Sequence, residues 1–402
     1  MSRLQSLPES IKQYLLITFN YWAFTLTDGA LRMLVLLYFH QLGYSPFQLA
    51  SLFIFYEFFG MVTNVVGGWL GARIGLNKTM NIGLGLQLIA LSMLLIPSEW
   101  ITVLWVMCAQ AISGVAKDLN KMSAKSTIKF LVDKESKDQL FKWVAAFTGS
   151  KNTLKGVGFF LGGFLLNFLG FFSAVLSMVM MLALIWLFSV VMLKKEFGKV
   201  KNKPKFSQIF SNNSSLNFLS VARLFLFAAR DVWFVIALPV YLSNVFSWSF
   251  TSIGTFMAFW IIGYGIVQSA APKLFNSKTS YSHMAGKWAF GLSVFTIFLT
   301  FALNITSYAE PTLMIGLTIF GIIFAINSSL HSFLVVDLAS RQGVSMDVGF
   351  YYMANASGRL MGTILSGYLY QKYGLEACVV FSSGFLLLAS VFVFRVNHDQ
   401  IK

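Results

Sequence analysis

Long apolar runs alternate with short polar connections along the whole chain. A helix of about 20 consecutive apolar residues crosses the hydrocarbon core of a bilayer. Runs of about that length occupy twelve segments, at 13–39, 47–71, 78–96, 101–124, 139–168, 171–193, 215–243, 250–272, 287–308, 311–337, 347–371 and 375–395. The pattern predicts an all-α membrane protein with twelve transmembrane helices. We expect two pseudo-symmetric six-helix bundles, 1–193 and 215–402, joined by a basic linker at 194–214.

The two halves carry similar residues at the same intervals. Lys155 is followed by glycines 3, 8 and 15 residues later, and Arg359 is followed by glycines at the same three intervals, with a shift of 204 residues. Asp28 and Asp231 each precede a tyrosine by ten residues, with a shift of 203. Two matches with nearly one offset predict a duplicated six-helix unit.

Composition and loop charges support a membrane protein and predict its orientation. The chain is 57% hydrophobic and 11% charged, whereas a soluble domain carries about 25% charged residues. Loops and tails on the side of the two termini hold 18 Lys and Arg, and those on the other side hold only Lys372. Positive loops stay in the cytoplasm, so we expect both termini to be cytoplasmic. Cys108 and Cys378 lie in apolar runs and indicate no disulfide framework.

Charged residues inside the predicted spans are unbalanced. Eight are basic and four are acidic, a surplus of four positive charges in the set Arg32, Lys117, Lys121, Lys151, Lys155, Arg223, Arg230, Arg359, Asp28, Glu57, Asp118 and Asp231. A charge at the bilayer centre costs about 2.5–3.5 kcal/mol, and such residues persist when they are paired or line a wet cavity. Four acids cannot neutralise eight bases, so the surplus predicts a small anionic substrate.

The depth of the basic residues divides them into two groups. Lys151 and Lys155 are four residues apart, share one helix face and lie near the midplane. Arg359 occupies the equivalent position in the second half, and Arg230 also lies near mid-span. We predict that these four residues bind the substrate. A structural ion network between helices is the alternative.

Lys117 and Lys121 lie in the cytoplasmic third of their span and begin a ladder that continues with Lys125 and Lys129. We predict that the first two bind the substrate in a basic access funnel. Local pairing with Asp118, or contact with lipid phosphate, is the alternative for them. The last two are better explained as interfacial lysines that contact anionic lipid.

Other charged residues are candidates for gating or ion pairing. Asp28 and Arg32 are four residues apart and could neutralise each other. Arg230 and Asp231 point about 100° apart on a helix, so we expect different partners for them. Arg223 could form a gate salt bridge or contact the substrate.

Three titratable residues are candidates for proton coupling. Glu57 lies in the apolar stretch FIFYEFFGM, Asp118 lies within the basic ladder, and His331 lies in NSSLHSF. Burial disfavours the charged form of a carboxyl, and histidine titrates near neutral pH. Hydrogen bonding to polar residues of neighbouring spans is the alternative for Glu57, and a structural role in helix packing is the alternative for His331. Polar residues that could orient a phosphate-like group, or simply join helices, are Asn20, Asn64, Asn327, Tyr351, Tyr352 and Asn355.

Motifs for other chemistry do not occur in the sequence. It has no G-x-x-x-x-G-K-[ST] loop for nucleotide binding, no His/Cys cluster with metal-site spacing, and no nucleophile–histidine motif. We therefore expect no enzymatic activity, no cofactor, no metal site and no nucleic-acid partner.

Two six-helix halves joined by a basic linker resemble the major facilitator superfamily. The stretch GGWLGARIGLNK matches that superfamily's G-x-x-x-D-R-x-G-x-x-K signature at Gly68, Arg73, Gly75 and Lys78, with Ala72 at the acidic position. The resemblance implies gating roles for Arg73 and Lys78. The missing acid puts in doubt the charge relay that usually accompanies them.

Longer stretches resemble one branch of that superfamily, the organoarsenical efflux permeases (ArsJ). They are NYWAFTLTDGALRMLVL, GVAKDLNKMSAKS, GSKNTLKGVGFFLGG, ARDVWFVIALPVYL, NSSLHSF and DVGFYYMANASGRLMGT. The resemblance implies a multi-pass protein of the bacterial cytoplasmic membrane that exports 1-arseno-3-phosphoglycerate and confers arsenate resistance. It also implies glyceraldehyde-3-phosphate dehydrogenase as the functional partner that makes this ester, without direct binding. It assigns no binding residues.

Other functions use the same basic residues. An organophosphate or sugar-phosphate transporter, working by exchange with phosphate or protons, would need the same cationic site. A transporter-like sensor of anions is a candidate of another class, although the longest segment outside the predicted spans is only about 20 residues and a sensor usually needs a soluble output domain.

Overall fold

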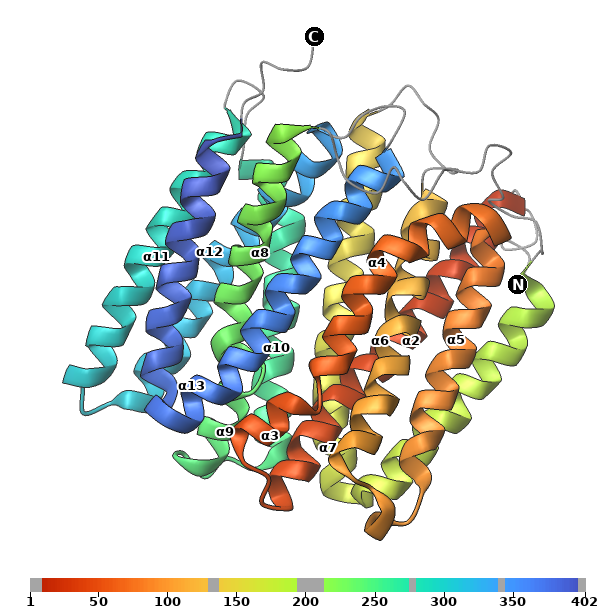
Figure 1. The fold of residues 1–402 in the computed structure, drawn as a ribbon, viewed down its shortest axis with the longest axis horizontal. Helices are drawn as coiled ribbons and strands as arrows, with labels where there is room; N and C mark the ends of the chain where they lie inside the picture. Colours follow the sequence, from red (N-terminus) through yellow and green to blue (C-terminus); the bar gives the residue numbers. More distant parts are fainter. Residues whose placement is uncertain (1–8, 129–136, 194–212, 275–279, 339–343, 397–402) are drawn as a thin grey trace.

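The computed structural model describes residues 9–128, 137–193, 213–274, 280–338 and 344–396, and every regular element in these ranges is helical (Figure 1). The first half contains α2 (Glu9–Gln41), α3 (Pro46–Ser51), α4 (Ile54–Ile74), α5 (Leu76–Ser92), the 3-10 turns η1 (Met93–Leu95) and η2 (Ser98–Trp100), α6 (Val103–Ile128) and α7 (Lys137–Met192). The second half contains α8 (Ser214–Phe234), α9 (Ala237–Asn244), α10 (Phe250–Ala270), the 3-10 turn η4 (Ala271–Leu274), α11 (Tyr281–Ile305), α12 (Ala309–Leu338) and α13 (Val344–Phe394). The predicted linker lies outside the described residues except for 213 and 214.

Two of these helices each contain two passes. The backbone of α7 is broken at Gly170 (φ 73°, ψ 175°), and that of α13 is broken at Gly374 (φ 80°, ψ −175°). This combination of angles is essentially restricted to glycine. Both residues close the interval pattern found in the sequence, so the repeat places a reversal of the chain at the same point in each half (Figure 1).

The number of passes is consistent with the twelve predicted spans, and the all-α membrane fold is confirmed. Eight described segments are long and apolar enough to cross a membrane, and two of them are the double passes of α7 and α13. The helices α6 and α8 are not among the eight, and each carries at least three charged residues. Adding these two helices and counting the double passes twice gives twelve.

The two halves meet at close glycine contacts. We call the end of the bundle that holds Gly170 and Gly374 the turn end, and the end where α2 begins and α13 finishes the terminal end (Figure 1). A Cβ on Gly163 of α7 would lie 2.5 Å from the carbonyl oxygen of Phe250, the first residue of α10. A Cβ on Gly367 of α13 would lie 2.6 Å from the carbonyl oxygen of Pro46, the first residue of α3. The repeat therefore produces two equivalent contacts between the halves near the turn end.

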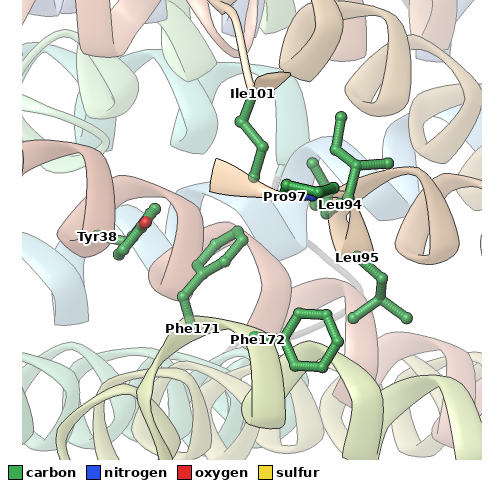
Figure 2. Close-up of a pocket in the computed structure, with 8 residues that line it drawn as sticks. Tyr38, Leu94, Leu95, Pro97, Ile101, Phe171 and Phe172 are labelled. Carbon is green, nitrogen blue, oxygen red and sulfur yellow. The ribbon is translucent and has the colours of Figure 1, made fainter. Parts of the chain in front are cut away.

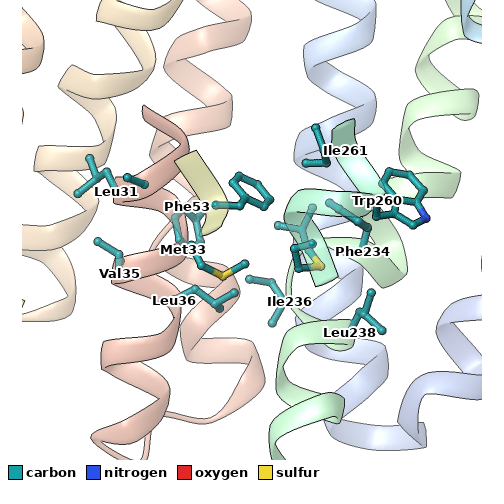
Figure 3. Packing of buried hydrophobic residues seen from close by; sticks show 14 of the residues in the cluster. Leu31, Met33, Val35, Leu36, Phe53, Phe234, Ile236, Leu238, Trp260 and Ile261 are labelled. Atoms are coloured by element: carbon teal, nitrogen blue, oxygen red, sulfur yellow. The ribbon is translucent and has the colours of Figure 1, made fainter. Parts of the chain in front are cut away.

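An apolar layer fills the space between the halves beside these contacts. Met33 and Leu36 of α2 and Phe53 belong to one buried cluster with Ile236 and Phe234, at the junction of α8 and α9. Figure 3 shows the two groups facing each other. Because α2 runs from the terminal end to the turn end, this layer lies on the turn-end side of the charged residues described next.

Candidate substrate site

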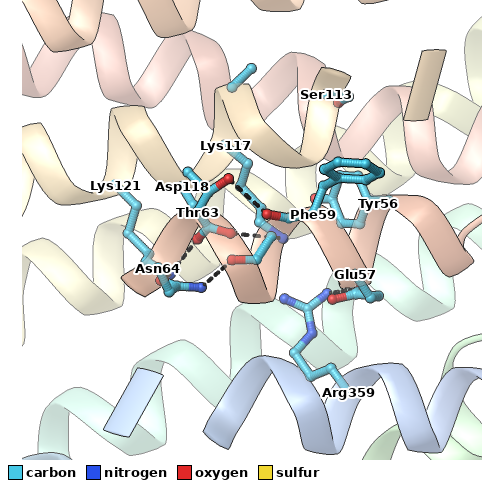
Figure 4. Close-up of polar contacts among 12 residues, drawn as sticks. Tyr56, Glu57, Phe59, Thr63, Asn64, Ser113, Lys117, Asp118, Lys121 and Arg359 are labelled. Atoms are coloured by element: carbon cyan, nitrogen blue, oxygen red, sulfur yellow. Dashed lines mark hydrogen bonds and ion pairs between the residues drawn. The ribbon is translucent and has the colours of Figure 1, made fainter. Parts of the chain in front are cut away.

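A chain of ion pairs crosses the boundary between the two halves. Arg32 Nη1 lies 2.9 Å from Glu57 Oε1, and Arg359 Nη2 lies 2.6 Å from the same oxygen. Arg359 Nε lies 3.3 Å from Asp231 Oδ2, and Arg230 Nη2 lies 2.6 Å from Asp231 Oδ1. Five charged side chains from α2, α4, α8 and α13 are thus connected, and Figure 4 shows the Glu57–Arg359 link.

The acidic members of this chain are fully buried, whereas two of its arginines, Arg230 and Arg359, are partly exposed. Glu57 and Asp231 are 0% exposed, while the side chains of Arg230 and Arg359 are 15% and 14% exposed. Glu57 lies in the first turn of α4, where the helix dipole also favours a negative charge. The side chains of Arg230 and Arg359 therefore remain partly open to a ligand, while Arg32 and the carboxylate partners are held inside the protein.

Some polar atoms of the network have no partner. Glu57 Oε2 and Arg32 Nη2 are buried, and neither has a hydrogen bond within the described part of the chain. An unsatisfied buried donor or acceptor costs about 1–3 kcal/mol, and more when the group is charged. One oxygen of the Glu57 carboxylate, Oε1, therefore accepts both arginine contacts, and the other, Oε2, keeps an unused acceptor position.

Lys155 adds a further basic group from α7. Its ammonium group is within electrostatic reach of Arg359, Arg32, Arg230 and Asp28. Among the described residues no carboxylate lies within the 4.0 Å that would define an ion pair with Lys155. Residues from both halves therefore converge with a local excess of positive charge. Lys151 lies one helical turn before Lys155 on the same helix.

A second ion-pair cluster lies on α4 and α6 (Figure 4). Asp118 is 0% exposed and pairs with Lys121 and, at 3.7 Å, with Lys117. Lys121 also donates to Asn64 Oδ1 at 2.6 Å. Lys117 Nζ lies 4.0 Å from the ring centre of Tyr56. The local pairing with Asp118 that the sequence allowed is therefore present.

Arg223 and His331 lie together in the second half. Arg223 Nε donates to Asn355 Oδ1 at 3.0 Å, and Nη1 donates to Ser328 Oγ at 3.1 Å. His331 is 0% exposed. No carboxylate pairs with Arg223 in the described ranges, so the structure contains the neutral contacts and no gate salt bridge there.

Three expectations about charged residues differ from the structure, two about ion-pair partners and one about the surroundings of Glu57. Asp28 and Arg32 form no ion pair with each other in the part of the chain described, because Arg32 turns to Glu57 and Asp28 accepts a hydrogen bond from the Tyr56 hydroxyl at 2.7 Å. Arg230 and Asp231 pair directly, since the long arginine side chain reaches back over its neighbour. Glu57 lies between two guanidinium groups and not in apolar surroundings.

The signature loop and the end of the lysine ladder add little to the site. Lys78 is exposed on α5 near the terminal end. The side chains of Arg73 and Lys125, and the whole of Lys129, lie outside the described parts of the structure. Gating by Arg73 and Lys78 and lipid contact by the two ladder lysines stay predictions.

A pocket of about 430 Å³ opens at the turn end of the first half (Figure 2). Its lining is largely apolar and consists of Tyr38, Leu94, Leu95, Ile96, Pro97, Ile101, Phe171 and Phe172. None of the predicted binding residues lines it, so this pocket is separate from the candidate site.

Some residues of the site were not predicted. Tyr56 bonds Asp28 and stacks under Lys117, and Tyr264 donates to Ser328 Oγ at 3.0 Å beside Arg223. Tyr56 adjoins Glu57 in the sequence, which is the only signal that could have identified it. Ser328 lies in the stretch NSSLHSF, between the candidates Asn327 and His331, and that stretch is the signal that could have identified it. Nothing in the sequence around Tyr264 distinguishes it from the other polar residues of the spans.

Comparison with known proteins shows which family the chain belongs to. A POT family transporter in complex with 5-aminolevulinic acid superposes with a TM-score of 0.75 at 13% identity, over 97% of this chain and 98% of that one. A protein described among proton-dependent oligopeptide transporters superposes with a TM-score of 0.69 at 13% identity, over 96% and 98%. At such identities the likeness shows the fold alone. A search of curated protein sequences found no match. The sequence profile of the Major Facilitator Superfamily matches residues 14–285, more than half of the chain, and the chain therefore belongs to that superfamily.

Proposed function

We propose that the protein is a secondary transporter of small organic anions that carry a phosphate- or arsenate-type group. The chain of ion pairs from Arg32 to Arg230 is the observation that carries this proposal, because it joins both halves and has an excess of positive charge around it. Lys155 lies within electrostatic reach of the chain and has no carboxylate partner among the described residues. A surplus of buried positive charge repels cationic substrates and attracts anions.

The substrate would compete with Glu57 for Arg359. A guanidinium presents a fork of donors that matches a phosphate or arsenate group, and Arg359 already uses this fork on Glu57 and Asp231. An anion that takes the place of Glu57 leaves that carboxylate with Arg32 in the first half. The direct ion pair between the halves is then broken. Binding thus favours movement of one half against the other, as alternating access requires.

Other basic residues would have distinct roles in this cycle. Lys155 supplies a point charge to the bound group, and Lys151 lies one turn away on the same helix face. Arg230, like Arg359, is a ligand from the second half. Lys117 and Lys121 would pass the anion between the terminal end and the central chain. Their shared partner Asp118 offsets one of their two positive charges when no anion is present.

Access in this conformation would be from the terminal end. The apolar layer around Met33, Leu36 and Ile236 lies on the other side of the charges and separates them from the turn end. Close glycine contacts between the halves occur on both sides of the charges, at Gly163 and at Gly149, so the apolar layer alone supports this direction of access. The loop lysines predict that the terminal end faces the cytoplasm. An anion from the cytoplasm would therefore reach the charged chain without crossing the apolar layer, as an exporter requires.

We further propose that the exported substrate is an arsenate ester, 1-arseno-3-phosphoglycerate, made by glyceraldehyde-3-phosphate dehydrogenase. The resemblance of the charged spans to organoarsenical efflux permeases supports this choice. Arsenate and phosphate groups have the same shape and charge, so an organophosphate exchanger is the second candidate. The basic residues described above favour both candidates equally.

A growth assay separates these candidates. An arsenic-sensitive bacterium without its own arsenic exporters would express this protein, the dehydrogenase, or both. The arsenate ester predicts that only the pair restores growth on arsenate and lowers cellular arsenic. If the pair does nothing although the protein is in the membrane, the arsenate ester is excluded, and phosphate esters are then tested in vesicles.

A further inference from the structure

A second polar cluster lies around Arg223 of α8, entirely within the second half. Arg223 is 5% exposed and bonds Asn355 of α13 and Ser328 of α12. Tyr264 of α10 donates to the same Ser328 hydroxyl. The other three arginines within the spans, at 32, 230 and 359, each bond a carboxylate. Arg223 therefore differs from them, because within the described ranges its charge is met only by neutral groups.

Buried polar groups without partners lie on the helices that contact this guanidinium, and two of them, His331 and Tyr351, lie near it. Both ring nitrogens of His331, both amide atoms of Asn327 and the hydroxyl of Tyr351 are buried and have no hydrogen bond in the described structure. His331 is three residues after Ser328, so the two lie on one side of α12, and its imidazole is within electrostatic reach of Arg223. The ring of Tyr351 lies 5.3 Å from the guanidinium carbon of Arg223.

Such a collection of groups is complete only with a ligand. A protein core satisfies nearly all of its buried polar atoms, and a buried charge without a counter-ion is costly. An acidic group at Arg223 would supply the missing negative charge and would accept hydrogen bonds from the imidazole and phenol donors. Carboxylate, phosphate and arsenate groups all have this acceptor chemistry.

The distance from Arg223 to Arg230 in the central chain sets an upper limit on the length of such a ligand. Arg223 and Arg230 are seven residues apart on α8, which is about two helical turns, so they share one face. The ring of Phe227 lies between them, with its centre 4.1 Å from the guanidinium carbon of Arg223 and 4.6 Å from that of Arg230. Those two carbons are therefore at most about 8.7 Å apart, the sum of these distances.

We propose that the Arg223 cluster is a second anion subsite, which binds the far acidic group of a substrate whose first acidic group is held at Arg230 and Arg359. The ligand class is a short molecule, with a backbone of three or four carbons, that has an acidic group at each end. This inference rests on the proposed function and specifies which anions the transporter prefers. The transporter then prefers two-ended anions over anions with one acidic group.

Binding of two matched probes to the purified full-length protein tests the subsite. 3-Phosphoglycerate carries a carboxylate and a phosphate, and glycerol 3-phosphate has the same phosphate without the carboxylate. We expect the wild type to bind 3-phosphoglycerate about 10- to 100-fold more tightly, as one charge-assisted contact allows. Arg223→Gln should abolish this preference and leave glycerol 3-phosphate within about threefold of wild type. Arg223→Lys should retain part of the preference, and Arg395→Gln, at an exposed arginine, should retain all of it.

His331→Leu provides a second variant that distinguishes binding from folding. Replacing a buried, unpartnered imidazole by an apolar side chain is not expected to lower the melting temperature. The same variant should reduce the preference for 3-phosphoglycerate, and it carries the test alone if Arg223→Gln does not fold. Equal binding of the two probes by the wild type, or an unchanged preference in His331→Leu, overturns the subsite and leaves the proposed function intact. A wild type that binds neither probe overturns the proposed function and the subsite with it.

Discussion

Glu57 is the residue at which stability and substrate binding should oppose each other most strongly. Glu57→Gln removes the negative charge that Arg32 and Arg359 share and keeps the size of the side chain. Glu57 Oε1 lies 2.9 Å and 2.6 Å from the two guanidinium groups, and the residue is 0% exposed. Removing one partner from a buried ion pair costs about 3–5 kcal/mol. We therefore expect Glu57→Gln to lower the free energy of unfolding by about that amount.

The same substitution should strengthen anion binding. In the wild type an incoming anion displaces the Glu57 carboxylate from Arg359, whereas in Glu57→Gln it meets two guanidinium groups without that competitor. An advantage of about 1.4 kcal/mol or more would raise the affinity for 3-phosphoglycerate at least tenfold. Thermal unfolding of the purified protein at increasing 3-phosphoglycerate concentration measures both effects, because a ligand of the folded state raises the melting temperature.

Glu310→Gln is the matched control. Glu310 accepts a hydrogen bond from Trp248 Nε1 at 2.8 Å at an exposed position, and glutamine retains an acceptor oxygen. We expect it to change stability by no more than about 0.5 kcal/mol, as is usual for surface substitutions. If Glu57→Gln has wild-type stability, or binds the anion more weakly, Glu57 is not the competing counter-ion of Arg359.

Three further substitutions test the fold and the charged chain. Gly374→Ala should lower the free energy of unfolding by about 1–3 kcal/mol, because alanine disfavours the angles of this reversal; Gly263→Ala, where a Cβ meets open space, is its control in the same melting assay. Gly163→Val should cost about 1–3 kcal/mol by overpacking against the Phe250 carbonyl, and unaltered melting would mean that the halves do not pack closely there. Arg359→Lys should weaken 3-phosphoglycerate binding at least tenfold, and wild-type affinity in a titration would exclude a bidentate role.

Much of the fold follows from local patterns in the sequence. The intervals after Lys155 and Arg359 identified equivalent positions, and their last members, Gly170 and Gly374, have nearly the same backbone angles. Such a reversal depends on the conformational freedom of one residue, which the sequence reveals directly. A run of about 20 mostly apolar residues is enough to predict a span, so α6 and α8 were predicted as membrane helices although each carries several charged residues.

The partners of the charged residues could not be predicted in the same way. Helical spacing allowed Asp28 to pair with Arg32, but the structure brings Glu57 to Arg32 from 25 residues away in the sequence. It also brings Arg359 to the same carboxylate across 302 residues. Which neighbour a long side chain selects depends on how whole helices pack, and one sequence does not determine that packing. The surplus of positive charge was predictable because it follows from counting residues in the sequence. The pairing of the individual charges depends on the three-dimensional structure and was not predictable.

Counterflow of labelled 3-phosphoglycerate in vesicles tests the central claim most directly. Purified wild type, Lys155→Met and Lys287→Met would be reconstituted with unlabelled 3-phosphoglycerate inside. Lys155 lies beside the charged chain, while Lys287 is exposed on α11 and serves as the matched control. A cationic site between the halves predicts transient accumulation of label by wild type and Lys287→Met, and at least tenfold slower accumulation by Lys155→Met. Equal accumulation by all three proteins would contradict that site, and no accumulation by the wild type would contradict transport of this class of anion.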